Sequence, residues 1–205
     1  MKRTFAVLAL ALSARALTAQ STPLPATRAT IFAGLNVATF TGDGSPDNRA
    51  GFIGGVGIVR PIAPDWSFQP ELAFSMKGAT AREGDVKAAV KLSYIEIPLL
   101  LRWDLPTSTM ARPFFHAGPA VAFRVGCRAE LSADDVTLSS SCDNDESDVK
   151  TLDLGVMFGG GVAFKHMDHT ASIGVRYNVG MNDVVDNRKN RVLSFIATFE
   201  WPWGH

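Results

Sequence analysis

The residues of this chain that could bind a metal ion lie in two short polar stretches. His166 and His169 flank an aspartate, and imidazoles with a carboxylate suit a transition metal. They fall in an expected turn with no third ligand in sight, which favours a solvated turn. Residues 143–148 (DNDESD) resemble the start of a calcium loop, but the EF-hand pattern requires Gly and Glu where this chain has Asp148 and Leu154. We therefore predict no metal site and no cofactor, with weak divalent-cation binding by the acidic stretch as the lesser alternative.

The groups needed for covalent catalysis are incomplete. The chain has no Gly-x-Ser-x-Gly motif. The glycines at 159–161 precede no helical pattern, so they are not a nucleotide fingerprint. An outer-membrane lipid hydrolase would need its nucleophile and base on the lipid-facing surface, whereas His116 falls on the inward set of the predicted strands and its partners cannot be placed from sequence. We predict that the protein is not an enzyme and has no catalytic residues.

The N-terminus has the layout of a secretory signal peptide. Lys2 and Arg3 precede an apolar stretch at residues 4–14, and small residues follow up to Ala19. We predict that residues 1–19 are a cleaved signal peptide, that 20–29 form a short N-terminal segment and that 30–205 form one domain. The nearly balanced charge gives no reason to expect a nucleic-acid partner.

The two cysteines, Cys127 and Cys142, flank a polar stretch. In an exported protein such a pair is expected to form a disulfide. A loop of this length corresponds to about 3 kcal/mol of stabilisation in the chain-entropy model. A metal site built on two cysteines is less favoured because no histidine lies near them.

The elements that position these residues are indicated by residues 66–77 (WSFQPELAFSMK), in which every second residue is apolar. A period of two is the pattern of a β-strand with two unlike faces. The pattern is longer than the usual strand of about 5–6 residues and reaches the roughly 9–11 residues that a transmembrane strand needs. A soluble barrel also alternates, so this segment raises the question of a membrane barrel without deciding it.

The same pattern predicts eight strands, at residues 31–40, 51–62, 66–78, 90–103, 112–126, 150–165, 170–181 and 191–201. The connections after the first, third, fifth and seventh strands are the longer ones; the third is expected at 79–88 and the fifth, acidic and longest, at 127–149. Bacterial outer-membrane barrels have an even number of strands, short periplasmic turns and longer external loops. We predict an all-β fold, an eight-stranded antiparallel up-and-down transmembrane β-barrel.

One face of the predicted strands mixes polar side chains with very small ones. Interior Gly is costly on an exposed strand but suits a narrow barrel, so this face is predicted to point inward. Buried charges need partners, and we predict a structural ion network of Glu71, Lys77, Glu96, Arg102, Arg124, Asp153 and Arg176. Glu71 and Glu96 lie on neighbouring predicted strands, where they could share Arg102, Arg124 or Arg176. Side chains fill an eight-stranded barrel, which disfavours a water-filled pore.

The opposite face is long and apolar and is predicted to meet lipid. Trp66, Trp103 and Trp201 lie at strand ends on the side of the short turns. We predict that they form an aromatic girdle at the periplasmic rim.

Several segments together resemble the PorT-like outer-membrane β-barrel family. They are residues 94–102 (YIEIPLLLR), 115–119 (FHAGP), 153–155 (DLG) with 159–161 (GGG), 176–180 (RYNVG) and 34–36 (GLN). The resemblance covers about residues 30 to 201 and implies an eight-stranded outer-membrane barrel. Its founding type is linked to protein secretion across the outer membrane, and most members have no assigned activity.

The function favoured by the sequence is that of a non-enzymatic barrel in the outer membrane of a Gram-negative-type bacterium. Its partners would be outer-membrane lipid and a protein that contacts the external loops, above all residues 127–149. Two alternatives stay open: an outer-membrane enzyme that modifies lipid, and a secreted soluble barrel that binds a small apolar ligand.

Overall fold

A computed structural model describes residues 24–40, 48–107, 109–133, 136–141, 151–182 and 189–204. Its regular elements are nine strands: β1 (Arg28–Phe40), β2 (Arg49–Ala63), β3 (Trp66–Glu83), β4 (Val86–Asp104), β5 (Ala111–Ala133), β6 (Val136–Ser141), β7 (Leu152–His166), β8 (His169–Gly180) and β9 (Asn190–Pro202). Within these described ranges, no helix is long and apolar enough to cross a membrane.

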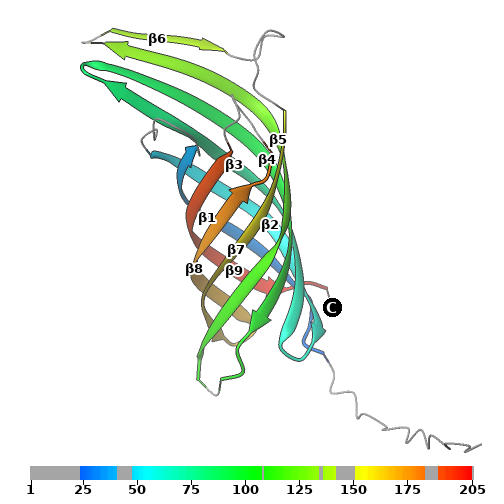
Figure 1. The fold of residues 1–205 in the computed structure, drawn as a ribbon. Coiled ribbons are helices and arrows are strands. Elements are labelled where there is room, and N and C mark those ends of the chain that lie inside the picture. Colours follow the sequence, from blue (N-terminus) through cyan, green and yellow to red (C-terminus); the bar gives the residue numbers. More distant parts are fainter. Residues whose placement is uncertain are drawn as a thin grey trace, which may run out of the picture.

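Eight of the strands close into an antiparallel barrel (Figure 1). The order runs β4-β3-β2-β1-β9-β8-β7-β5, and the pairing of β4 with β5 closes the circle. β1 pairs with β9, so the first and last strands lie side by side. The predicted eight-stranded antiparallel barrel is therefore confirmed. Its first strand begins at Arg28, two residues inside the segment that was expected to precede the domain.

One end of the barrel, called the turn end below, carries the short connections. Pro64 and Asp65 join β2 to β3, and Met167 and Asp168 join β7 to β8. Met167 has a φ of 53°, the left-handed conformation that a tight turn requires. Both ends of the described chain lie here as well, because the Trp203 N–H donates to the Thr27 carbonyl at 2.8 Å.

At the opposite end the sequence prediction needs correction. The expected loop at 79–88 is instead a hairpin in which only Gly84 and Asp85 separate β3 from β4. Part of the expected loop at 127–149 is also strand, because β5 runs on to Ala133 and β6 returns beside it. Gly84 has a φ of 56°, so it supplies the left-handed residue of the tight turn. We call the part formed by residues 78–91, 126–133 and 136–141 the protruding sheet (Figure 1).

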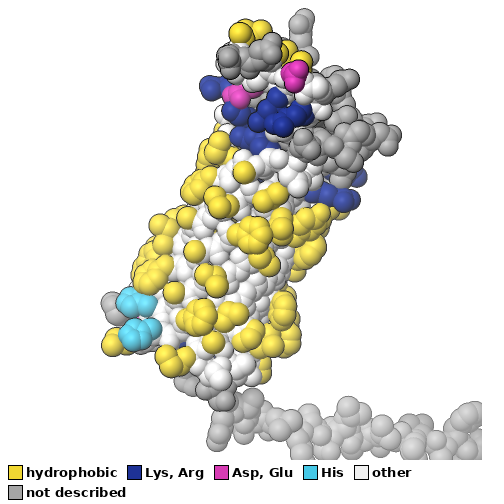
Figure 2. Space-filling model, turned by 90° about the vertical axis from the view of Figure 1, so that its left-hand side faces the viewer, with side chains coloured by type: hydrophobic (Ala, Val, Ile, Leu, Met, Phe, Trp, Pro, Cys, Tyr) yellow, Lys and Arg dark blue, Asp and Glu magenta, His cyan; other side chains and the backbone are white. Residues whose placement is uncertain are grey.

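The barrel wall shows the alternation that the sequence predicts. Outward positions are apolar and exposed, and Figure 2 shows them spread over the wall, with Lys and Arg gathered towards the protruding end. Inward positions are polar or small. A Cβ on Gly159 would lie 3.0 Å from Nε2 of His116 and 2.2 Å from the Val175 carbonyl oxygen, so the strand needs glycine there.

Candidate functional site

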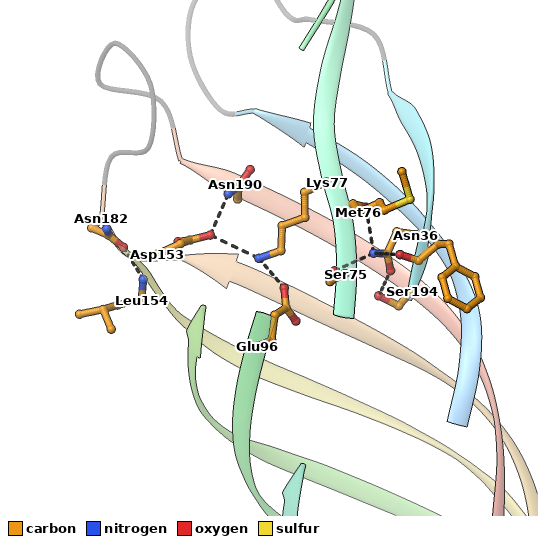
Figure 3. Close-up of polar contacts among 11 residues, drawn as sticks. Asn36, Ser75, Met76, Lys77, Glu96, Asp153, Leu154, Asn182, Asn190 and Ser194 are labelled. Atoms are coloured by element: carbon orange, nitrogen blue, oxygen red, sulfur yellow. Dashed lines mark hydrogen bonds and ion pairs between the residues drawn. The ribbon is translucent and has the colours of Figure 1, made fainter. Parts of the chain in front are cut away.

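The charged side chains inside the barrel form three groups along its length. In the group nearest the protruding sheet, Lys77 Nζ lies 2.7 Å from Glu96 Oε1 and 3.3 Å from Asp153 Oδ2 (Figure 3). Asn190 Nδ2 donates to the same Asp153 oxygen at 2.7 Å. Lys77 Nζ also lies over the ring of Tyr94, 4.8 Å from the ring centroid. The Lys77 side chain is 1% exposed, so two carboxylates and an aromatic face replace its water.

Neutral polar groups extend this first group across β1, β3 and β9. Asn36 Nδ2 donates to Ser75 Oγ at 2.9 Å and to the Met76 carbonyl at 3.1 Å (Figure 3). Ser194 Oγ donates to Asn36 Oδ1 at 2.7 Å. The Asn36 side chain therefore links three strands from the inside, and its burial is compensated by hydrogen bonds.

The middle group is built on a two-pronged ion pair. Arg176 Nη1 and Nη2 donate to the two oxygens of Glu71 at 2.7 and 3.0 Å. Gln69 donates to the same carboxylate at 2.6 Å, and Arg176 Nε donates to His116 Nε2 at 3.3 Å. Because β8 and β3 are not neighbours in the sheet, this pair connects opposite walls of the barrel.

The third group lies near the turn end. Arg102 Nη1 donates to Glu200 at 2.6 Å, and its Nη2 contacts Asp104 at 2.8 Å. Arg28 contacts the other Glu200 oxygen at 2.8 Å. The Arg102 guanidinium also stacks over Phe114 at 4.2 Å. Glu200 is fully buried, and Arg28 and Arg102 compensate the charge of its carboxylate, one at each oxygen.

The structure places the predicted network residues inside the barrel, with Arg124 half-buried and the others buried. Among the described ion pairs, Glu71 pairs with Arg176 and Glu96 with Lys77, so the two carboxylates have different partners there. The sequence reasoning missed Glu200. The signal was present, because Glu200 is the inward residue between two outward aromatic residues of β9.

The tryptophans predicted as a girdle stand on the outer surface near the turn end. The rings of Trp66 and Trp103 stack with centroids 6.0 Å apart, and Trp201 stacks on Phe199 at 6.1 Å. His169 stacks on Phe199 in turn, at 5.5 Å. Across the described ranges, no group of three or more His, Cys, Asp or Glu side chains is placed to hold a metal ion.

The predicted disulfide and the predicted calcium-like stretch fall mainly outside the described residues. Cys142 and residues 143–148 belong to those parts of the chain. Cys127 is buried at the base of the protruding sheet, against Leu92 and Tyr94. Its pairing with Cys142 stays a prediction.

The barrel is closed, its outer wall is apolar, aromatic side chains stand at its rim and its interior charges are paired. This is the architecture of an outer-membrane protein. Residues 18–186 match the family described as "Outer membrane protein beta-barrel domain". The chain belongs to this family. The match supports this broad family, and the finer PorT-like resemblance stays a prediction. No curated protein sequence matches the chain.

The chain is similar to solved structures of outer-membrane proteins. Neisserial surface protein A (NspA) matches at 15% identity over 85% of this chain and 97% of its own, with a TM-score of 0.52. Ail, the attachment invasion locus protein of Yersinia pestis, matches at 14% identity over 86% and 100%, with a TM-score of 0.44. The outer membrane enzyme PagL matches at 11% identity over 85% and 99%, with a TM-score of 0.47.

Outer-membrane barrels usually have their short turns in the periplasm, an orientation that would make the protruding sheet of this chain extracellular. On the outer face of the sheet, Lys91 donates to Glu130. This hydrogen bond lowers the pKa of Glu130 below its usual value. Arg128 stands beside the pair, because its Cα is the register partner of Lys91.

Proposed function

We propose that the protein is a non-enzymatic outer-membrane barrel that holds an interaction surface outside the cell. The observation that carries the proposal is the contrast between its two parts. Charged groups in the barrel interior are engaged with one another across the lumen. The surface available to a partner lies instead in the protruding sheet, where every residue of β6 is exposed.

The size of the interior spaces supports a filled barrel. A cavity of about 20 Å³ lies beside His116 and Arg176, which is roughly the room that one water molecule needs. A second cavity, of about 110 Å³, opens near the periplasmic end between Arg28, Arg102 and Lys165. The ion pairs separate these spaces from the extracellular end, which favours an anchor over a channel.

The finer PorT-like assignment is part of this proposal. Its support is that the resembling segments supply the interior groups: Glu96 and Arg102 from residues 94–102, His116 from 115–119 and Arg176 from 176–180. If PorT-like proteins share these interior groups, the groups would serve to maintain the structure of the barrel. A role in secretion would then be exercised through contacts of the barrel with other proteins.

An epitope-insertion experiment tests the exposed surface. A short tag inserted between Gly84 and Asp85 should be detected by antibody on intact cells, because these residues form the tip of the β3–β4 hairpin. The matched control is the same tag between Met167 and Asp168, which should be detected only after the outer membrane is permeabilised. The reverse result would refute the orientation.

Two functional measurements test the rest of the proposal. The purified barrel in planar bilayers should give no steady conductance, because its lumen is occupied by paired side chains. Incubation with lipopolysaccharide or phospholipid should leave the lipid unchanged by mass spectrometry. Regular conductance steps would contradict the filled barrel, and cleaved or transferred acyl chains would establish the enzyme alternative.

A further inference from the structure

The two faces of the sheet exchange character where it leaves the barrel. The face continuous with the barrel interior is polar at Lys77 and Glu96 but becomes apolar beyond Leu92. The backbone register places one residue from each of four strands in a straight row on this face. The row consists of Ala81, Ala88, Leu131 and Leu138.

This apolar row is exposed. Leu131 is 49% exposed and Leu138 is 66% exposed, and Val136 beside them is 63% exposed. A groove of about 540 Å³ runs over Ala81, Ala88 and Leu131. Outside the membrane, a contiguous apolar face of this kind marks a binding surface.

The row ends at β6, which is the edge strand of the described sheet. Among the described strands, β6 pairs with β5 alone, and it lies farthest from the periplasmic turns (Figure 1). Edge strands are normally protected by charge or proline. The sequence of β6, VTLSSS, contains neither. A strand that added itself to β6 along residues 136–140 would meet the edge that faces away from β5, with the side chains of Val136 and Leu138 on one face.

The opposite face of the protruding sheet is positively charged. It carries Arg82, Lys87, Lys91 and Arg128, whereas Glu130 is the acidic side chain on the described part of this face. Because Glu130 is paired with Lys91, the other cations are left to attract an acidic partner.

The chain's own neighbouring segments are poorly suited to cover the apolar face. Residues 41–47 (TGDGSPD) and 142–150 (CDNDESDVK) are polar and largely acidic, and 183–188 (DVVDNR) offers only two valines. These compositions favour an external occupant.

We propose that β6 is a docking edge for an extended segment of a separate polypeptide, which adds a strand to the protruding sheet. Its apolar side chains lie over Leu138 and Val136, and its alternate side chains are acidic and face the side of Arg128. This is strand addition, with backbone hydrogen bonds for affinity and alternate side chains for specificity. The inference rests on the proposed function and names the partner of the surface proposed there.

Fluorescence anisotropy with two labelled probe peptides tests the inference, with the protein in lipid nanodiscs. One peptide alternates Val with Asp, and the other alternates Val with Lys. The Val/Asp peptide should bind saturably, and the Val/Lys peptide should bind at least about tenfold more weakly, a difference of roughly 1.4 kcal/mol. Leu138→Asp should weaken Val/Asp binding by about tenfold or more, and Arg128→Glu should reverse the preference between the peptides. Met167→Asp, at an exposed periplasmic residue, is the matched control and should bind as the parent does.

Three results would overturn the inference. The first is that neither peptide binds saturably, and the second is that Leu138→Asp binds the Val/Asp peptide as tightly as the parent does. The third is self-association without any peptide that Leu138→Asp abolishes, which would assign the edge to a second copy of this chain. Retained near-ultraviolet and far-ultraviolet circular dichroism shows whether each variant is folded. Thr137→Glu, which adds a negative charge on the side that the acidic side chains face without touching the apolar face, should also weaken Val/Asp binding. If the tag at Gly84 is detected on intact cells while the peptides fail, the docking inference falls and the proposed function stands.

Discussion

Strands β3, β4 and β5 pass through two environments, and their faces differ between the barrel wall and the protruding sheet. In the wall, apolar side chains such as Leu99 point outward and charges such as Glu96 point inward. In the protruding sheet, cations such as Arg128 stand on the outer face and Leu131 on the other. The alternation continues along β3 and β4, whereas in β5 an irregularity at Val125, which has no register partner, shifts it by one residue. In all three strands the apolar face is the outer one in the wall and the inner one in the protruding sheet.

The reversal follows from what each face meets. In the wall, the outer face contacts lipid and the inner face is a narrow lumen in which charges pair. Beyond the wall, lipid is gone and the outer face meets water, so Lys91 and Arg128 are tolerated there without burial. The apolar inner face of the protruding sheet lies beyond the barrel and no longer borders its lumen. Comparing the same substitution in the two regions therefore separates the effects of lipid, burial and water.

The largest difference is expected for arginine removal. Arg176→Met leaves Glu71 buried without its cation, and breaking one partner of a buried pair costs about 3–5 kcal/mol of the free energy of unfolding. Arg128→Met, on the exposed outer face of the protruding sheet, should change that free energy by less than about 0.5 kcal/mol. Urea unfolding in lipid vesicles measures both variants. Equal losses would show that the interior pair is solvated.

The double variant sharpens this test. Adding Glu71→Gln to Arg176→Met removes the unpaired charge and should recover part of the lost stability. Failure to recover any stability would mean that Arg176 acts through packing, for example against Phe32, over which its guanidinium lies 5.5 Å from the ring centroid.

An intermediate difference is expected for leucine replacement. Leu99→Arg places a charge on the lipid-facing wall and should cost about 2–4 kcal/mol of the free energy of unfolding near the bilayer midplane. Leu138→Arg makes the same change on the protruding sheet, where water solvates the new charge, and should cost less than about 0.5 kcal/mol. The same vesicle titration compares them. A large cost at Leu138 would place that residue in lipid and contradict the assigned boundary.

The barrel could be predicted from sequence because lipid imposes a strict period of two. Between Trp66 and Phe74, the large side chains of Trp66, Phe68, Leu72 and Phe74 mark the outward face, and the structure agrees. The protruding sheet was missed because residues 79–91 lack this contrast. Alanines there alternate with residues such as Thr80 and Lys87, and the Gly84-Asp85 turn makes the stretch read as a loop.

The partners inside the barrel could not be predicted because pairing depends on strand tilt. Glu71 and Arg176 are on strands that do not touch, yet their side chains meet across the lumen. Lys77 reaches Glu96, although the Cα register pairs Glu96 with Ala73. Sequence alternation gives the face on which a charge lies. The height at which two charges meet follows from the stagger of the closed barrel.

The smallest effect is expected for the surface pair of the protruding sheet. Lys91→Met removes the hydrogen bond that lowers the pKa of Glu130, so this pKa should rise towards its ordinary value, which NMR titration of the Glu130 carboxylate measures. A carboxylate with a lowered pKa favours the folded state above its unfolded pKa, and that contribution is lost as pH falls through the folded pKa. Because the pair is exposed to solvent, salt should reduce the shift, whereas the lumen pairs should respond little to salt. A salt-insensitive shift at Glu130 would mean that the outer face of the protruding sheet is shielded from water, and the contrast between the two regions would then fail at this point.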